Sequence, residues 1–272
     1  MRNRAFRNYM LLVALTTVAL AGTAWGQDQG REFHWQGKLN AHQIIEIKNI
    51  NGDIDAKSTT GDQAQVTAEK SGPQADQIKI EVVPSNEGVT ICAVYPSSVF
   101  GGSSSGKCDS GDHSNSSNVR GDRAKVHFTV LVPKNVRFSG MNVNGGINAE
   151  DMTAEVRANT VNGSVHVSTS SWAEVNTVNG SVHASMGDAA WNGTLKIASV
   201  NGTIELQMPD DLNANVSFKS VNGNMSSDFP LTISNKWPVG HSAKGQVGSG
   251  GRELVIETVN GSVQLRKGGG GI

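Results

Sequence analysis

Two histidines occupy equivalent places in neighbouring stretches of this chain. His166 and His183 each end the pentapeptide Asn-Gly-Ser-Val-His. Two imidazoles at one repeat position are a possible metal-binding pair. The equivalent residues of two later stretches are Glu205 and Gln264, so no third ligand recurs at that position. We therefore interpret all four as outward-facing strand residues, and we predict no metal-ligating residue.

Paired acids offer a second kind of chemistry. Glu150-Asp151 and Asp210-Asp211 resemble the carboxylates with which pectin-degrading β-helices cleave glycosidic bonds. Each pair occurs once, at a turn between strands, which favours turn formation over catalysis. The glycine-rich stretches 248–251 and 268–271 lack the Lys-Ser/Thr of a phosphate-binding loop, and no Gly-x-Ser-x-Gly elbow occurs. We predict no catalytic residue, no cofactor and no enzyme activity.

Two cysteines are predicted to form a disulfide. Cys92 and Cys108 enclose 15 residues, and neither shows the spacing of a redox or zinc motif. In an oxidising compartment such a pair is usually bridged. Closing a loop of this length stabilises the folded chain by about 3 kcal/mol.

The first residues are typical of an export signal. Arg2, Arg4 and Arg7 precede an apolar run over residues 10–21, and residues 24–26 offer a cleavage site after Gly26. The run is shorter than the roughly 20 residues of a spanning helix. We therefore expect export to the periplasm, the cell surface or the medium, with no integral membrane span after cleavage.

Composition indicates a β-sheet protein with no nucleic-acid partner. The net charge is −1, whereas binding to phosphates requires clustered Lys and Arg. Glycine makes up 32 of 272 residues and aromatics only 5%. The apolar residues are mostly Val, Ile and Ala, which suit sheets with small side chains.

One tripeptide recurs along the chain, as Val-Asn-Gly or, in an outlying copy, Ile-Asn-Gly. The repeat-turn residues are Asn51, Gly52, Asn144, Gly145, Asn162, Gly163, Asn179, Gly180, Asn201, Gly202, Asn222, Gly223, Asn260 and Gly261. From Asn144 onward, successive asparagines are 18, 17, 22, 21 and 38 residues apart. A period near 20 predicts a solenoid. The spacing of 38 suggests that one copy has lost its turn near Trp237.

Apolar residues alternate with polar ones on both sides of each turn, which predicts short strands. We expect Asn-Gly to supply positive φ angles at tight corners. Each turn closes either a two-residue hairpin, in a meander or propeller-like sheet, or a corner between stacked coils. The near-identity of the turns favours stacking, because corners in contact must repeat their shape. Val165, Val182, Ile204 and Val263 should then line one inner wall.

The motif Thr-Val-Asn-Gly-Ser-Val resembles the repeats of a bacterial family known as "putative adhesins", exported domains of unknown function. Residues 160–165, 177–182 and 258–263 match it in full, and the resemblance extends over about 31–267. It implies an all-β, right-handed β-helix-like solenoid with coils of about 20 residues and an N-terminal β cap. It implies no catalytic residues.

These observations divide the chain into five segments. They are a signal peptide (1–26), an N-terminal β cap (27–96), a flexible Ser- and Gly-rich excursion (97–122), the β-solenoid repeats (123–267) and a Gly-rich tail (268–272). We expect a non-enzymatic envelope or surface protein that presents a rigid β surface to a protein or glycan partner for adhesion or binding. The alternatives are a carbohydrate-active β-helix enzyme and an envelope-stress sensor or scaffold.

Overall fold

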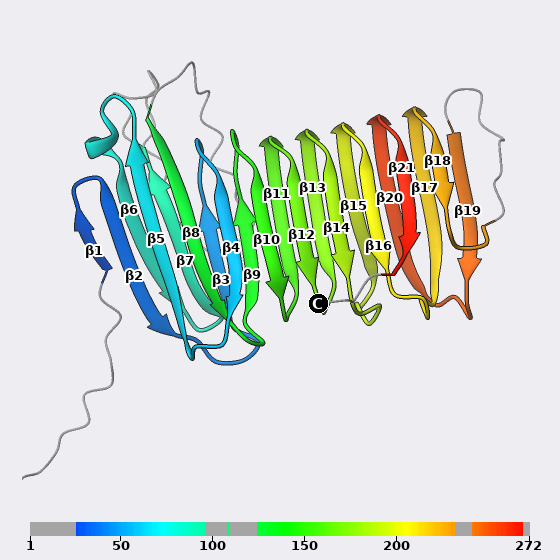
Figure 1. Ribbon diagram of the computed structural model, residues 1–272, viewed down its shortest axis with the longest axis horizontal. Coiled ribbons are helices and arrows are strands. Elements are labelled where there is room, and N and C mark those ends of the chain that lie inside the picture. Colours follow the sequence, from blue (N-terminus) through cyan, green and yellow to red (C-terminus); the bar gives the residue numbers. More distant parts are fainter. Residues whose placement is uncertain (1–25, 96–107, 109–123, 232–240, 269–272) are drawn as a thin grey trace, which may run out of the picture.

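Two long β-sheets form a rod-like stack in the protein (Figure 1). The computed structural model describes residues 26–95, 108, 124–231 and 241–268. Within these residues, the only helix is the three-residue 3₁₀ helix η1 (Ala75–Gln77). The expectation of an all-β, solenoid-like fold is confirmed, and neither sheet closes on itself.

The strands divide between the sheets as follows. Sheet A has 11 strands in the order β1 (Gly26–Gln29), β2 (Glu32–Lys38), β5 (Gln63–Ser71), β8 (Lys125–Pro133), β4 (Ile54–Thr59), β10 (Ile147–Met152), β12 (Val165–Thr169), β14 (Val182–Met186), β16 (Ile204–Met208), β21 (Val263–Lys267) and β18 (Met225–Ser227). Sheet B has ten strands in the order β19 (His241–Val247), β17 (Ala214–Asn222), β20 (Arg252–Asn260), β15 (Thr194–Asn201), β13 (Ala173–Asn179), β11 (Val156–Asn162), β9 (Arg137–Met141), β3 (Ile44–Lys48), β7 (Gly88–Val94) and β6 (Lys79–Ser85).

Each Asn-Gly turn carries the chain from sheet B to sheet A. For example, Asn162 and Gly163 link β11 to β12, and these strands pair with β13 and β14 of the next coil rather than with each other. The pairs between coils are parallel. The turns are therefore corners of stacked coils, and the hairpin alternative is wrong.

Alternating apolar residues of both sheets meet between them and form the core. Val165, Val182, Ile204 and Val263 are fully buried. Each is the register partner of the next on β12, β14, β16 and β21, as expected for one inner wall. Burial at this level contributes roughly 1.5 to 3 kcal/mol for each side chain.

The last coil does not follow the sequence order. Strand β20 lies between β15 and β17, and β21 lies between β16 and β18. The 38-residue spacing therefore does not mark a missing level between the last two turns. After β18 the chain forms β19, which runs antiparallel to β17. The final coil, β20 and β21, then lies between the coil of β15 and β16 and the coil of β17 and β18. Trp237 itself lies outside the described residues.

One chain of side-chain hydrogen bonds joins the turn asparagines. Each Nδ2 donates to the Oδ1 of the preceding asparagine in the stack, at 2.7–3.0 Å. The order along the stack is Asn51, Asn144, Asn162, Asn179, Asn201, Asn260 and Asn222. Asn51, the outlying copy in the sequence, is thus the first rung of the ladder.

The turn glycines are required by close stacking. Among the seven, φ is positive only at Gly52 (103°) and Gly145 (156°), so the expectation of positive φ at every corner is wrong. A Cβ added at Gly180 would overlap the carbonyl oxygen of Gly163 in the adjacent coil, and the other turn glycines meet a backbone oxygen in the same way. Space therefore excludes any side chain at these positions.

The N-terminal region caps the stack with antiparallel strands. Strands β1, β2 and β5 extend sheet A, and β6 extends sheet B beyond β7. Phe33 and Trp35 of β2 are buried against the core. These pairings and buried aromatics differ from the repeats that follow, as expected for an end cap.

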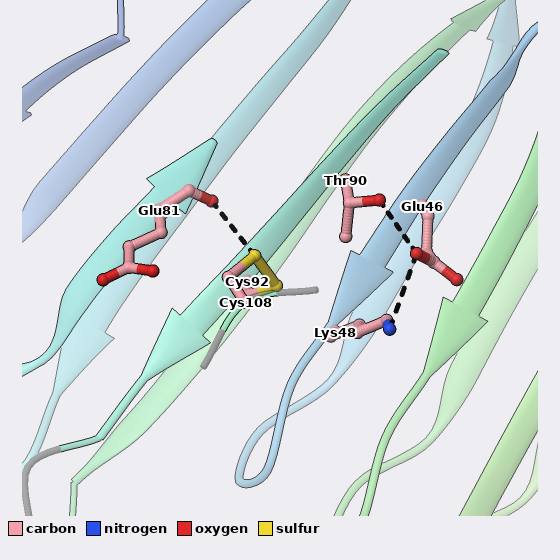
Figure 2. The surroundings of a disulfide bond; sticks show 6 residues. All are labelled: Glu46, Lys48, Glu81, Thr90, Cys92 and Cys108. Atoms are coloured by element: carbon pink, nitrogen blue, oxygen red, sulfur yellow. Dashed lines mark hydrogen bonds and ion pairs between the residues drawn. A yellow bond between two sulfur atoms is a disulfide. The ribbon is translucent and has the colours of Figure 1, made fainter. Parts of the chain in front are cut away.

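The predicted disulfide is present in this cap (Figure 2). Cys92 of β7 is bonded to Cys108, with the two Cα atoms 5.6 Å apart. Both cysteines are buried. Near them, the buried carboxylate of Glu46 accepts a hydrogen bond from Thr90 Oγ1 at 2.9 Å and lies 3.6 Å from Lys48 Nζ. The rest of the predicted excursion, 97–122, lies outside the described residues, as does the predicted signal segment up to residue 25.

Candidate functional site

A row of polar side chains crosses the outer face of sheet A. His166, His183, Glu205 and Gln264 are successive register partners on β12, β14, β16 and β21. The residues on either side of them along each strand are buried. The four side chains therefore share one outward face, as the sequence pattern predicted.

The row continues toward the N-terminal cap and meets a shallow hollow. Asn148 of β10 is the partner of His166 on one side and of Asp55 of β4 on the other. The hollow has a volume of about 240 Å³. Its polar lining consists of Asp53, Asp55, Asn148, Ser164, His166 and His183.

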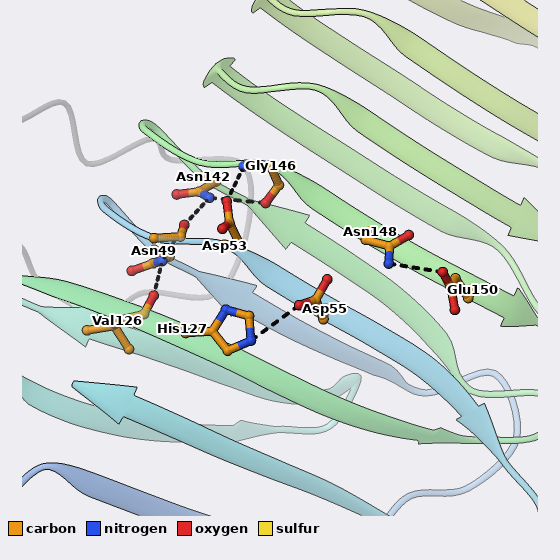
Figure 3. A network of polar contacts seen from close by, with 10 residues as sticks. Asn49, Asp53, Asp55, Val126, His127, Asn142, Gly146, Asn148 and Glu150 are labelled. Carbon is orange, nitrogen blue, oxygen red and sulfur yellow. Dashed lines mark hydrogen bonds and ion pairs between the residues drawn. The ribbon is translucent and has the colours of Figure 1, made fainter. Parts of the chain in front are cut away.

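Backbone and side-chain contacts fix the acids and the amide of this hollow (Figure 3). Asp53 Oδ1 accepts a hydrogen bond from the backbone N–H of Gly146 at 2.7 Å, and Asp55 Oδ2 lies 3.2 Å from His127 Nε2. Asn148 Nδ2 donates to Glu150 at 3.1 Å. One oxygen of each aspartate is thus engaged, and its partner orients the carboxylate on the face.

The two histidines lie side by side at the far edge of the hollow. Their ring centroids are 6.2 Å apart, and the ring planes are tilted by 34°. His183 Nδ1 lies 3.4 Å from a carboxylate oxygen of Glu205. Both histidines are exposed, so their rings can contact a partner.

The acids that the sequence nominated for glycosidic cleavage lie elsewhere. Glu150 and Asp151 lie in β10 just before its last residue, Met152, and their carboxylates face Lys57 Nζ at 4.0 and 3.6 Å. Asp210 and Asp211 occupy an exposed turn after β16. Neither pair lines the hollow. Asp210 and Asp211 form a turn as expected, whereas Glu150 and Asp151 lie inside β10 at an irregularity in its pairing with β12, so the expectation of a turn at that pair is wrong.

Sheet B carries a second, larger groove of about 340 Å³ over β9, β11 and β13. Its polar groups pair mainly with one another. Arg157 Nε lies 3.7 Å from Glu174, and Asn176 Nδ2 donates to Asn159 Oδ1 at 3.0 Å. Because these groups already satisfy each other, we regard the hollow on sheet A as the stronger candidate site.

Exposed aliphatic side chains follow the edge where the sheets meet. In the described part of the chain, the large exposed hydrophobic residues are the valines that precede the turn asparagines, at 38–42% exposure. They are Val161, Val178, Val200, Val259 and Val221 in stack order. The strip is one residue wide, and each valine is more than half covered.

Sequence reasoning missed the acidic end of the site. Asp53 and Asp55 follow the outlying Asn51-Gly52 turn and alternate with buried Ile54 and Ala56. That alternation is the signal that could have aligned them with Gly146 and Asn148.

Among the described residues, no group of three or more His, Cys, Asp or Glu is arranged to hold a metal ion. In the same residues, no helix has the length and apolar character needed to cross a membrane.

Solved structures that align with this chain include three described by names of adhesion proteins. A "putative cell adhesion protein" from Clostridium sporogenes ATCC 15579 aligns with a TM-score of 0.45 and 11% identity, covering 86% of this chain and 99% of its own. A "putative adhesin" from Bacteroides fragilis NCTC 9343 has a TM-score of 0.35 and 10% identity, covering 87% and 96%. Another from Parabacteroides merdae ATCC 43184 has a TM-score of 0.28 and 9% identity, covering 87% and 97%.

No curated protein matches the chain. The model of one family, described as Toastrack DUF4097, matches residues 32–266. This match includes the cap from β2 onward, the seven Asn-Gly corners and the polar face of sheet A. The resemblance that the repeat motif suggested is thereby confirmed, and the chain belongs to the Toastrack DUF4097 family.

Proposed function

We propose that the protein is an exported, non-enzymatic binding protein of the cell envelope or cell surface. Its partner, a protein or a glycan, contacts the polar outer face of sheet A. The observation that carries this proposal is the hollow, where acids, an amide, a hydroxyl and two imidazoles face outward from strands in register. Such groups recognise polar partners by hydrogen bonds and charge.

The scaffold supports this proposal through its rigidity. Each strand that contributes to the hollow is hydrogen-bonded on both sides within sheet A. The Asn ladder also fixes the corner from which these strands begin. A face held in this way loses little conformational entropy on binding. The disulfide supports export, because such bonds persist in oxidising compartments.

A carbohydrate-active enzyme is the second candidate, because the hollow contains two carboxylates. Asp53 and Asp55 lie on the same face of sheet A. Glycosidases need one acid free to protonate the leaving group and another to act as base or nucleophile. Here Asp53 accepts a backbone N–H and Asp55 faces His127, contacts that favour a binding role.

Site-specific photocrosslinking in cells tests the proposed face. A photoreactive amino acid replaces Gln264 on sheet A or, as the matched control, Thr194, which is exposed on β15 of sheet B. We expect one defined crosslinked partner from position 264 and none from position 194. Equal crosslinking from both positions, or none from position 264, would contradict the proposal.

Incubation of the purified protein with pectin, alginate and peptidoglycan tests the enzyme alternative. We expect no depolymerisation. Depolymerisation that the change Asp55→Asn abolishes would replace the binding role with catalysis, since the substitution keeps the shape of the side chain and removes its charge.

A further inference from the structure

His166 and His183 form an imidazole pair whose geometry the sequence alone did not show. They are direct register partners on the parallel strands β12 and β14, and both are exposed on the outer face of sheet A. Neighbouring strands lie about 4.8 Å apart. Two imidazoles bound to one metal ion through nitrogens at about 2.0–2.1 Å place their ring centroids at a separation of about 5 Å. The observed 6.2 Å is therefore within reach of small side-chain rotations.

Glu205 orients one member of the pair. Its carboxylate lies 3.4 Å from His183 Nδ1, which leaves the Nε2 atom of that ring as the donor available to a metal. A carboxylate behind a metal-binding histidine holds the ring in place and raises its basicity. Glu205 occupies the next strand in register, β16, so sheet geometry maintains this arrangement.

We propose that His166 and His183 bind one transition-metal ion of the zinc, nickel or copper class on the outer face of sheet A, with Glu205 as a positioning residue. Imidazole nitrogens suit these ions, whereas calcium and magnesium require oxygen ligands. The two rings fill two coordination positions, and the remaining positions face solvent beside the hollow. Because zinc binding is measured with protein and metal alone, this site can stand or fall independently of the proposed partner.

His34, on β2 of the same sheet face, provides an internal comparison. His34 also faces a carboxylate, that of Glu32 at 3.5 Å. Its register partners are Gln27 and Thr67, so no second imidazole lies on an adjacent strand. His34 therefore has the carboxylate but lacks the paired ring, which makes it a matched control.

Calorimetric titration of zinc chloride into the untagged full chain tests the site. We expect one zinc ion per chain, with magnesium giving no heat. His166→Ala and His183→Ala should each weaken zinc binding at least about tenfold, and Glu205→Gln should weaken it by about tenfold without changing the stoichiometry. His34→Ala should leave the affinity unchanged. Circular dichroism should be unaltered in all four variants, because these side chains are on the surface.

Three results would overturn this site: no zinc binding by the wild-type chain, unchanged binding in His166→Ala, or an equal loss in His34→Ala. Nickel chloride provides a second, independent readout of the same site. Nickel should protect the imidazoles of His166 and His183 from chemical modification, and reduced protection in the Glu205→Gln variant at the same metal concentration would support the assigned roles. Absence of protection would contradict them.

Discussion

The N-terminal cap and the repeat stack hold their polar groups in different ways. In the cap, Tyr95, Asn49 and Asn51 are buried together, and the Tyr95 hydroxyl lies 3.1 Å from Asn49 Oδ1 and 3.0 Å from the carbonyl oxygen of Asn51. Burial raises the pKa of Tyr95 above its usual value, which extends to higher pH the range in which its hydroxyl stays protonated. In the repeats, asparagines such as Asn179 are exposed and bond mainly to copies of themselves.

This difference indicates where stability is concentrated. The cap depends on particular contacts, namely one disulfide, one buried tyrosine and antiparallel strands that end the stack. The repeats distribute their stability over identical rungs and a continuous apolar core. Outward positions of the repeats are consequently free to vary, and the polar face of sheet A is built from them.

The largest effect is expected where two coils touch through glycine. Gly180→Ala in the repeats should reduce the free energy of unfolding by about 3 kcal/mol or more, because the new Cβ overlaps a backbone oxygen that cannot move away alone. Gly61→Ala in the cap is the matched control. Its Cβ would lie 3.6 Å from Thr59 Oγ1, so the change should be within about 0.5 kcal/mol. Urea denaturation measures both, and equal effects would break the distinction between stacked and free glycines.

Removal of the disulfide should have the next largest effect, confined to the cap. The double change of Cys92 and Cys108 to alanine should lower the free energy of unfolding by roughly 2 to 4 kcal/mol. A reducing agent should produce the same loss in the wild-type chain and none in the double variant. If reduction leaves the wild-type transition unchanged, the bond does not contribute to stability.

Loss of one ladder asparagine should cost more at the cap than in the middle of the stack. Asn51→Ala removes a buried side chain that accepts from Asn144 and donates to the carbonyl of Ala124 at 3.4 Å, so we expect about 1 to 3 kcal/mol. Asn179→Ala removes two exposed side-chain hydrogen bonds, which water can replace. It should therefore lower the free energy of unfolding by about 1 kcal/mol or less. Thermal unfolding of both variants shows which substitution causes the larger loss of stability. A larger loss for Asn179 would mean that ladder continuity outweighs burial.

The smallest effect concerns an ion pair network on sheet B. Hydrogen bonds from Lys219 and then Lys196 lower the pKa of Glu257, whose carboxylate is 28% exposed. A carboxyl group whose pKa is lower in the folded chain than in the unfolded chain stabilises the fold at pH values above its unfolded-state pKa. This contribution disappears as the pH falls through the pKa that the group has in the folded chain. Glu257→Gln should therefore cost up to about 0.5 kcal/mol at pH 7, and the difference from wild type should vanish in acid. A constant difference across this range would assign the effect to packing.

Local pattern was sufficient to predict the coils but not their order. Alternation around each Val-Asn-Gly placed Val165 and Val182 in the core and His166 and His183 outside. The insertion of β20 between β15 and β17 has no local signal, because nearly identical coils can pair on either side of one another. The glycine requirement was similarly hidden, since contact with the next coil, rather than the conformation of the turn itself, excludes a side chain at Gly180.

The site was predictable only where the repeat was recognised. Glu205 and Gln264 could be aligned with the histidines from their distance to the turn. Asp53 and Asp55 belong to a coil whose turn was noted but which was assigned to the cap, so their place beside Asn148 was missed. Which outward groups remain available to a partner depends on side-chain contacts such as that between Asp55 and His127, and these follow only from the three-dimensional structure.

The central claim, that the outer face of sheet A is the binding surface, is tested most directly by two matched arginine substitutions. Asn148 of sheet A and Asn176 of sheet B are both half-buried, and each donates one side-chain hydrogen bond, at 3.1 and 3.0 Å. Binding of labelled protein to an envelope fraction should fall at least about tenfold for Asn148→Arg, because a bulky cation then fills the hollow, and should be unchanged for Asn176→Arg. Loss of binding in Asn176→Arg, with Asn148→Arg unaffected, would move the function to sheet B and contradict this account.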